Sequence, residues 1–185
     1  IDDMVQDKFP KTVWANDIIE QVNIVARCAR NALLFKDPNE VRKEFDRLAE
    51  ARKVVSERFG QLEKTITSEA GKKLIADSIA LRQEYVSDTN QFIESVKAGK
   101  VDEATAHLLG KMRQSQRQFM DSINKLTDFQ TELMKKSGEE TDKAAQQANF
   151  LILTLAIAAL LLGAGFAAWV TRSITVPVNA AVHAA

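Results

Sequence analysis

The chain has 185 residues and carries 25 basic and 25 acidic side chains, so its formal net charge is zero. Without a basic tract, this balance gives no electrostatic reason to expect nucleic-acid binding. With only 7 glycines and 3 prolines, and with helix-forming residues dominant, the composition predicts long helices. The single cysteine, Cys28, excludes an internal disulfide, and His107 and His183 lack metal-ligand spacing, so we expect no metal and no cofactor.

The first two predicted helices are separated by a proline. The first runs from about Met4 to Phe35, with apolar residues every three or four positions. Pro38 disfavours helix at the residue before it, and we expect Asn39 to cap the second helix. The second helix has the most regular seam: Val41, Phe45, Leu48, Arg52, Val55, Phe59, Leu62 and Ile66. Alternating steps of four and three are typical of helices packed side by side.

The third and fourth helices repeat this pattern. After a turn at 67–71, the third helix carries the seam Leu74, Ser78, Leu81, Tyr85, Asp88, Phe92 and Val96. Gly99 is expected to end the third helix and Asp102 to open the fourth. The seam of the fourth helix is Leu109, Met112, Gln116, Phe119, Ile123, Leu126, Gln130 and Leu133. Apart from Gly138, nothing interrupts this helix before a long apolar run, so we expect it to continue into that run.

The apolar run reads FLILTLAIAALLLGAGFAAWV and occupies residues 150–170 without a charge. About 20 apolar residues suffice for a helix to cross a bilayer. Trp169 lies at its far edge and Arg172 just beyond, which is typical of the cytoplasmic end of a span. We therefore expect residues 1–149 to lie in the periplasm and those from about 171 to lie in the cytoplasm of a bacterial inner-membrane protein. A preceding transmembrane helix before Ile1 is expected to export the first part.

Short connections between long helices make neighbours antiparallel. The predicted fold is all-α: an antiparallel up-down four-helix bundle whose fourth helix continues into a transmembrane helix. The predicted organisation is a ligand-binding bundle at 1–149, a transmembrane helix at 150–170 and a short cytoplasmic segment at 171–185.

Polar residues at seam positions indicate a binding site. An unpaired guanidinium is costly to bury, so Arg52 must reach water, a protein partner or a ligand. At 1.5 Å rise per residue, several arginines and a tyrosine lie roughly 15–21 Å from the end of the bundle that carries the turns at 37–38 and 98–100. The candidate ligand-binding residues are Arg27, Arg30, Asn31, Arg52, Arg82, Tyr85 and Arg113.

Arginine binds carboxylates through paired hydrogen bonds, so this set favours a small compound with more than one carboxylate. The alternative is that the arginines form separate surface ion pairs, with Glu50, Glu84 and Asp88 as nearby partners. Tyr85 would then be an ordinary core residue. No nucleophile or metal constellation accompanies the carboxylates of the third helix, so we expect no catalytic residues and no enzymatic activity.

The segment after the apolar run, Arg172-Ser173-Ile174-Thr175-Val176-Pro177-Val178, resembles the start of a HAMP linker. With the bundle before it, the chain resembles the sensor portion of a bacterial methyl-accepting chemotaxis protein of the four-helix-bundle class. Residues 27–34 are similar to the part of helix one that, in the amino-acid receptors of this family, supplies ligand-binding arginines from both subunits of a dimer. Asn31 and Leu109 depart from the amino-acid pattern, and the surplus of arginine is closer to sensors of malate, succinate or citrate.

The resemblance implies a homodimer that signals by a small displacement of helix four through the membrane. It also implies coupling to a cytoplasmic kinase through a C-terminal part beyond residue 185. The alternatives are the sensor of a membrane histidine kinase or cyclase, or a receptor for amino acids, aromatic acids or a periplasmic binding protein. A bundle without a small ligand is a further alternative.

Overall fold

A computed structural model of the chain describes residues 7–175 and residue 178. The chain divides into two compact units, Ile1–Ser137 and Gly138–Ala185. Between residues 9 and 175, helix is interrupted only at 35–37, 66–68 and 98–100, and this range contains no strand.

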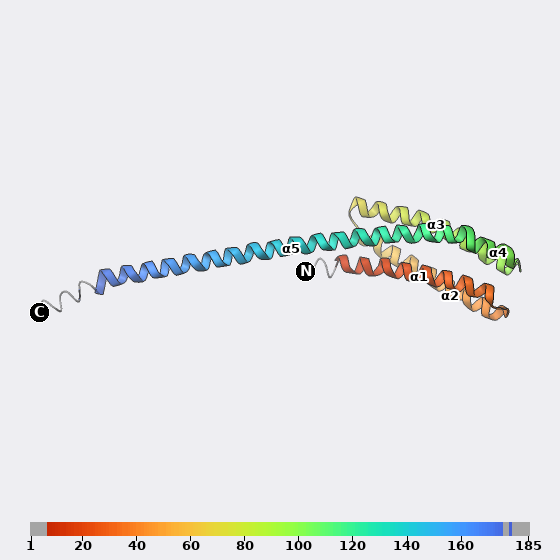
Figure 1. Ribbon diagram of the computed structural model, residues 1–185, viewed down its shortest axis with the longest axis horizontal. Helices are drawn as coiled ribbons and strands as arrows, with labels where there is room; N and C mark the ends of the chain where they lie inside the picture. Colours follow the sequence, from red (N-terminus) through yellow and green to blue (C-terminus); the bar gives the residue numbers. More distant parts are fainter. Residues whose placement is uncertain (1–6, 176–177, 179–185) are drawn as a thin grey trace. The chain divides into compact units, whose positions relative to one another are not determined.

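The first unit is built from four antiparallel helical segments, the fourth of which is divided by a π-helical turn. Figure 1 shows α1 beside α2, and α3 beside α4 and the start of α5. The predicted antiparallel four-helix bundle is therefore confirmed. The elements are α1 (Phe9–Leu34), α2 (Pro38–Thr65), α3 (Glu69–Lys97), α4 (Val101–His107), η2 (Leu108–Met112), α5 (Arg113–Val170) and η3 (Thr171–Thr175).

The N-terminal ends of α2 and α3 are set by side-chain caps. The carboxylate of Asp37 accepts a hydrogen bond from the backbone N–H of Asn39 at 2.9 Å, so Asp37 caps α2 and the predicted cap, Asn39, is wrong. The reason is that Pro38, which has no N–H to leave unpaired, suits the first position of a helix. The hydroxyl of Ser68 caps α3 by accepting from the N–H of Gly71 at 3.2 Å.

Two glycines are required by the turns. Gly99 has a φ of 72°, in the left-handed region that residues with a Cβ adopt only at a cost. Gly71 lies where the chain enters α3, and a Cβ there would meet the side chain of Ile66 and stand 2.9 Å from the Ser68 hydroxyl oxygen. Both connections therefore depend on the absence of a side chain.

The seam predicted for the fourth helix is wrong at its first member, Leu109, which is 63% exposed. The cause is η2, whose wider π-helical turn shifts the direction of the side chains relative to a continuous α-helix. Ala104, before this turn, and Met112, its last residue, are both buried. The helix also begins at Val101, one residue before the predicted Asp102.

An aromatic layer joins three helices in the core. The ring of Phe119 on α5 lies 6.1 Å, centroid to centroid, from Phe59 on α2 and 6.1 Å from Tyr85 on α3. Both distances are in the range of favourable aromatic pairs. This layer is defined by Phe59, Tyr85 and Phe119 and is called the aromatic layer below.

Several hydroxyl side chains are buried in the core. Each of four donates its hydroxyl to a carbonyl three or four residues earlier in its own helix, so it is paired without a partner on another helix. These residues are Ser78, Thr89, Ser115 and Ser122.

Within the second unit, α5 is apolar on every side from residue 150 to residue 170. Its most apolar window has a mean hydropathy of 2.5, with none of it buried. Large side chains from Phe150 to Trp169 are more than half exposed. Exposed apolar surface of this extent is unfavourable in water. In the part of the chain that the structure describes, the helical stretch Val101–Ser173 is the one long and apolar enough to cross a membrane.

Some sequence predictions fall on residues outside the described ranges. They are the start of the first helix at Met4, and residues 176–177 and 179–185 of the HAMP-like segment.

Replacing Gly99 with alanine should lower the free energy of unfolding of the bundle by about 1 kcal/mol, because alanine is strained at positive φ. The matched control is Gly60→Ala within α2. A Cβ at Gly60 meets nothing within 4 Å, and the change should raise the free energy by about 0.5–1 kcal/mol. Urea unfolding followed by circular dichroism measures both. Equal effects of the two substitutions would contradict the assigned turn.

Candidate functional site

The predicted binding layer is only partly assembled by the structure. Arg52, Arg82 and Tyr85 come together where α2 packs against α3, and Arg30 on α1 lies near enough for its charge to act on Tyr85. The other candidates lie elsewhere in the bundle.

Arg52 is half-buried and binds neutral acceptors on α3. Its Nη1 donates to Oδ1 of Asn90 at 2.7 Å, and its Nη2 donates to the carbonyl oxygen of Val86 at 3.2 Å. The guanidinium therefore bridges α2 and α3 without neutralising its charge.

Two of the carboxylates considered as partners for these arginines have other neighbours. Glu50 pairs with Lys53 at 3.8 Å, and Asp88 lies 3.8 Å from the imidazole of His107. Among residues 7–175, neither Arg52 nor Arg82 takes part in an ion pair.

Arg82 is held by the aromatic layer and by a hydroxyl. Its guanidinium carbon lies 5.6 Å from the centroid of the Phe59 ring, a cation–π geometry. Its Nη2 donates to the hydroxyl of Ser56, and that hydroxyl donates to the carbonyl oxygen of Arg52 at 3.0 Å. The two arginines are thus linked through one serine.

The two charges destabilise one another. Burial lowers the pKa of Arg52, and the positive charge of Arg82 lowers it further. Burial also lowers the pKa of Arg82, although Glu63 opposes this effect. Arginine nevertheless stays protonated in proteins, so the lowered values express the cost of holding two cations close together and partly out of water. An anion beside both guanidinium groups would reduce that cost.

Tyr85 supplies a polar atom with no partner. The residue is 4% exposed, and its hydroxyl forms no hydrogen bond within the described part of the chain. Burial raises the pKa of this phenol, while the charge of Arg52, the nearby Thr89 hydroxyl and the charge of Arg30 oppose the rise. The Thr89 hydroxyl itself donates to the backbone carbonyl of Tyr85. The phenol hydroxyl is therefore neutral at physiological pH and can donate a hydrogen bond.

A depression of about 450 Å³ opens beside Arg82 on the surface of α3. Its lining is Ile79, Arg82, Gln83, Val86, Ser87 and Asn90. Guanidinium, carboxamide and hydroxyl groups are hydrogen-bond donors suited to an anion.

Asn31 belongs to a second polar cluster, between α1 and α2. Its Nδ2 donates to Oε2 of Glu44 at 3.3 Å, and Nη1 of Arg47 donates to Oε1 at 2.9 Å. Glu44 is only 6% exposed. Burial, together with the Glu44 carboxylate, raises the pKa of the Cys28 thiol to about 11. Asn31 is thus occupied in joining two helices.

Sequence reasoning missed Glu44 because it precedes the seam residue Phe45 by one position and reads as a surface charge. The signal for its burial lies in two spacings. Arg47 follows it by three residues, on the same face of α2. Asn31, an amide that can donate to a carboxylate, lies across the intervening turn.

The remaining candidates are exposed. Arg27 lies on α1, and its charge acts on Cys28. Arg113 lines a shallow surface depression formed by the fourth helix alone, together with Arg117. In the described residues, Arg113 has no hydrogen bond to another candidate. The layer predicted from residue counting therefore reduces to Arg52, Arg82 and Tyr85, with Arg30 nearby.

Replacing Tyr85 with phenylalanine should raise the free energy of unfolding by about 1 kcal/mol, because it removes a buried hydroxyl that has no partner. Tyr85→Leu is the control, since it also removes the ring that packs on Phe119, and it should lower the free energy by roughly 2 kcal/mol or more. Thermal unfolding of both variants gives the comparison. A loss of stability in Tyr85→Phe would show that the hydroxyl is paired in solution.

The acid stability of the bundle should depend on Glu44. Burial alone would raise its pKa, but the hydrogen bonds from Cys28 and Asn31 and the charge of Arg47 outweigh it and lower the pKa below 4.5. Because the folded value lies below the unfolded one, the stabilisation is fully present above pH 4.5 and is lost as the pH falls through the folded value.

Glu44→Gln should therefore lower stability at pH 7 by roughly 1–2 kcal/mol and show a shallower decline in acid than the unmodified chain. Urea unfolding across an acid pH series measures this difference. The control is Glu50→Gln, on a surface carboxylate that is 69% exposed. If Glu44→Gln kept the full acid decline, the carboxylate would not carry it.

Comparison with known proteins identifies the class of the bundle. Residues 1–145 match the family model described as a four helix bundle sensory module for signal transduction. A protein of Acetivibrio thermocellus named "Putative sensory transducer protein" is 23% identical over 153 residues, which cover 83% of this chain. The chain spans 28% of the length of that relative.

The family match covers more than half of the chain and confirms the resemblance to the four-helix-bundle class of chemoreceptors. It agrees with the four helical segments between α1 and the first part of α5. The chain belongs to the four-helix-bundle sensory modules of chemoreceptors, and its role is signal transduction.

Proposed function

We propose that this chain is the extracytoplasmic sensor and transmembrane helix of a bacterial chemoreceptor, and that its bundle binds a small organic acid with two or more carboxylates. Malate, succinate and citrate are the compounds of this class to test. The observation that carries the proposal is the pair Arg52 and Arg82, two neighbouring cations of which neither forms an ion pair among residues 7–175, although Glu63 is near enough for its charge to act on Arg82.

The donors near the pair explain why a carboxylate suits it. A guanidinium presents parallel N–H groups that match the two oxygens of a carboxylate. The unpaired hydroxyl of Tyr85 lies near enough to Arg52 for the two to interact electrostatically. A second carboxylate would use the second arginine, so a compound with two acidic groups gains more than one with a single group.

The aromatic layer connects the site to α5, the helix that we propose crosses the membrane. Tyr85 packs on Phe119, and Phe119 belongs to α5, which extends to Val170. A ligand that holds Arg52, Arg82 and Tyr85 in one arrangement favours the position of Phe119 that fits it. The ligand shifts this equilibrium only by its difference in affinity for the two arrangements.

The remaining parts of the proposal concern the whole receptor. Arg172 favours a cytoplasmic location for the end of the span, and the bundle then lies in the periplasm. The name of the Acetivibrio thermocellus relative supports a sensory transducer. In that protein class we expect a dimer and a cytoplasmic part coupled to a kinase, with no enzymatic activity in the bundle.

Succinate should bind to the full chain in lipid nanodiscs, and Arg52→Gln and Arg82→Gln should each weaken its affinity at least about tenfold, since each removes a charged hydrogen-bond donor. Titration calorimetry with succinate, malate and citrate measures the effect. The matched control is Arg117→Gln, an exposed arginine on α5 that should leave the affinity unchanged. Absence of binding by all three acids, or equal affinities in all variants, would overturn the proposed ligand class.

A further inference from the structure

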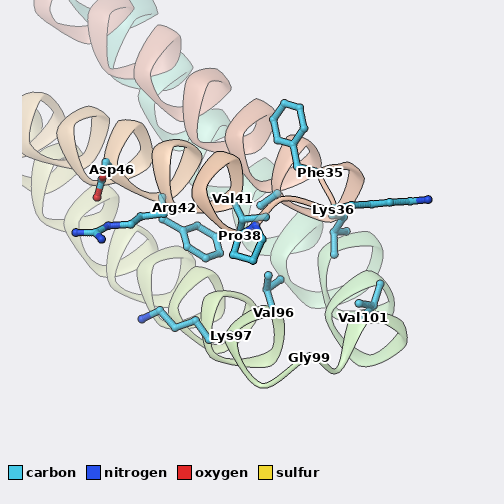
Figure 2. Close-up of a pocket in the computed structure, with 13 residues that line it drawn as sticks. Phe35, Lys36, Pro38, Val41, Arg42, Asp46, Val96, Lys97, Gly99 and Val101 are labelled. Atoms are coloured by element: carbon cyan, nitrogen blue, oxygen red, sulfur yellow. The ribbon is translucent and has the colours of Figure 1, made fainter.

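A cavity lies at the end of the bundle that carries the turns at 35–37 and 98–100, called the apical end here. It has a volume of about 640 Å³, within the range of small-molecule sites. Figure 2 shows residues from both turns around it. Its lining on α2 ends at Asp46, roughly 9 Å of helix before Arg52, and it shares no residue with the depression beside Arg82.

The wall of the cavity is mainly apolar. Its apolar side chains come from all four helical segments of the bundle: Leu33, Pro38, Val41, Phe45, Val96 and Val101. These residues are not closed over by the protein, and Val101 is 52% exposed. A wall of this kind stabilises an aromatic or aliphatic body that enters from water.

One side of the cavity is cationic. In Figure 2, Arg42 and Lys97 extend toward the same side, and Lys36 extends away from the cavity. Lys97 is paired with Glu94 at 3.1 Å. Arg42 has no ion pair among the described residues, although Asp46 also lines the cavity. An unpaired guanidinium therefore stands beside an open apolar wall.

We propose that the apical cavity binds an amphipathic monocarboxylate, with its apolar body against Val41 and Val96 and its carboxylate on Arg42. A dicarboxylate suits this wall less well, because Lys97 on the same side is already paired with Glu94 and a second charge would have to lie against apolar side chains. The apical cavity and the arginine pair thus select different acids. Since the cavity is lined from both turns, its ligand bridges the α1–α2 and α3–α4 connections.

The test uses phenylacetate as the probe and phenylacetamide as its neutral analogue, both titrated into the full chain in lipid nanodiscs. Phenylacetate should bind more tightly than the amide. Arg42→Gln should weaken phenylacetate binding about tenfold and abolish the preference over the amide. Val101→Gln should also weaken phenylacetate, because it places a polar group on an exposed part of the wall.

Two controls separate this site from others. Lys43→Gln removes a charge next to Arg42 in the sequence, but Lys43 does not line the cavity and pairs with Glu40 at 2.7 Å, so phenylacetate affinity should not change. Succinate affinity should be equal in Arg42→Gln and the unmodified chain, which keeps the result independent of the arginine pair.

Three outcomes would overturn the proposal. One is that phenylacetate and phenylacetamide bind equally or not at all. Another is that Arg42→Gln leaves the preference intact. The third is that Arg42→Gln and Val101→Gln alter dimerisation in sedimentation runs without probe, which would assign the apical cavity to a second copy of the chain.

Discussion

The stacking of Phe119 on Phe59 and Tyr85 is the interaction on which the rest of the bundle depends. It brings α2, α3 and α5 to a common layer, and it supplies the ring over which the guanidinium of Arg82 lies. Arg82 and Arg52 are then placed through Ser56, so the position of both cations follows from the packing of apolar rings. The arginine pair and α5 are therefore connected by a continuous series of side-chain contacts.

Much of the architecture follows from local signals in the sequence. The seam of α2 and the breaks at Pro38 and Gly99 are sufficient to give four antiparallel segments, because short connections permit little else. The apolar run at 150–170 is recognisable from length and lack of charge. The exposed Leu109 shows where this reasoning fails, since a π-helical turn leaves no clear mark in side-chain spacing.

The site is harder to predict than the fold, because the sequence does not give the direction in which each side chain points. Counting residues gives height along a helix, and it correctly grouped Arg52, Arg82 and Tyr85. It does not give the side of the bundle on which a side chain emerges. For this reason it also groups Arg113 with these residues, although Arg113 lies on an exposed face of the fourth helix. Asn31 shows a further limit: its partner Glu44 is buried by tertiary packing that a single helix does not reveal.

The hydroxyls of Ser78, Thr89, Ser115 and Ser122 have a mechanical consequence. Each is satisfied by a carbonyl of its own helix, so moving one helix against another breaks none of these bonds. A polar side chain that bonds across a helix interface fixes the register of the two helices, whereas these side chains move with the helix that carries them. The buried hydroxyls therefore do not oppose a small sliding or turning of adjacent helices, and any resistance from hydrogen bonds comes from those between helices, such as Arg52 to Asn90 and Asn31 to Glu44.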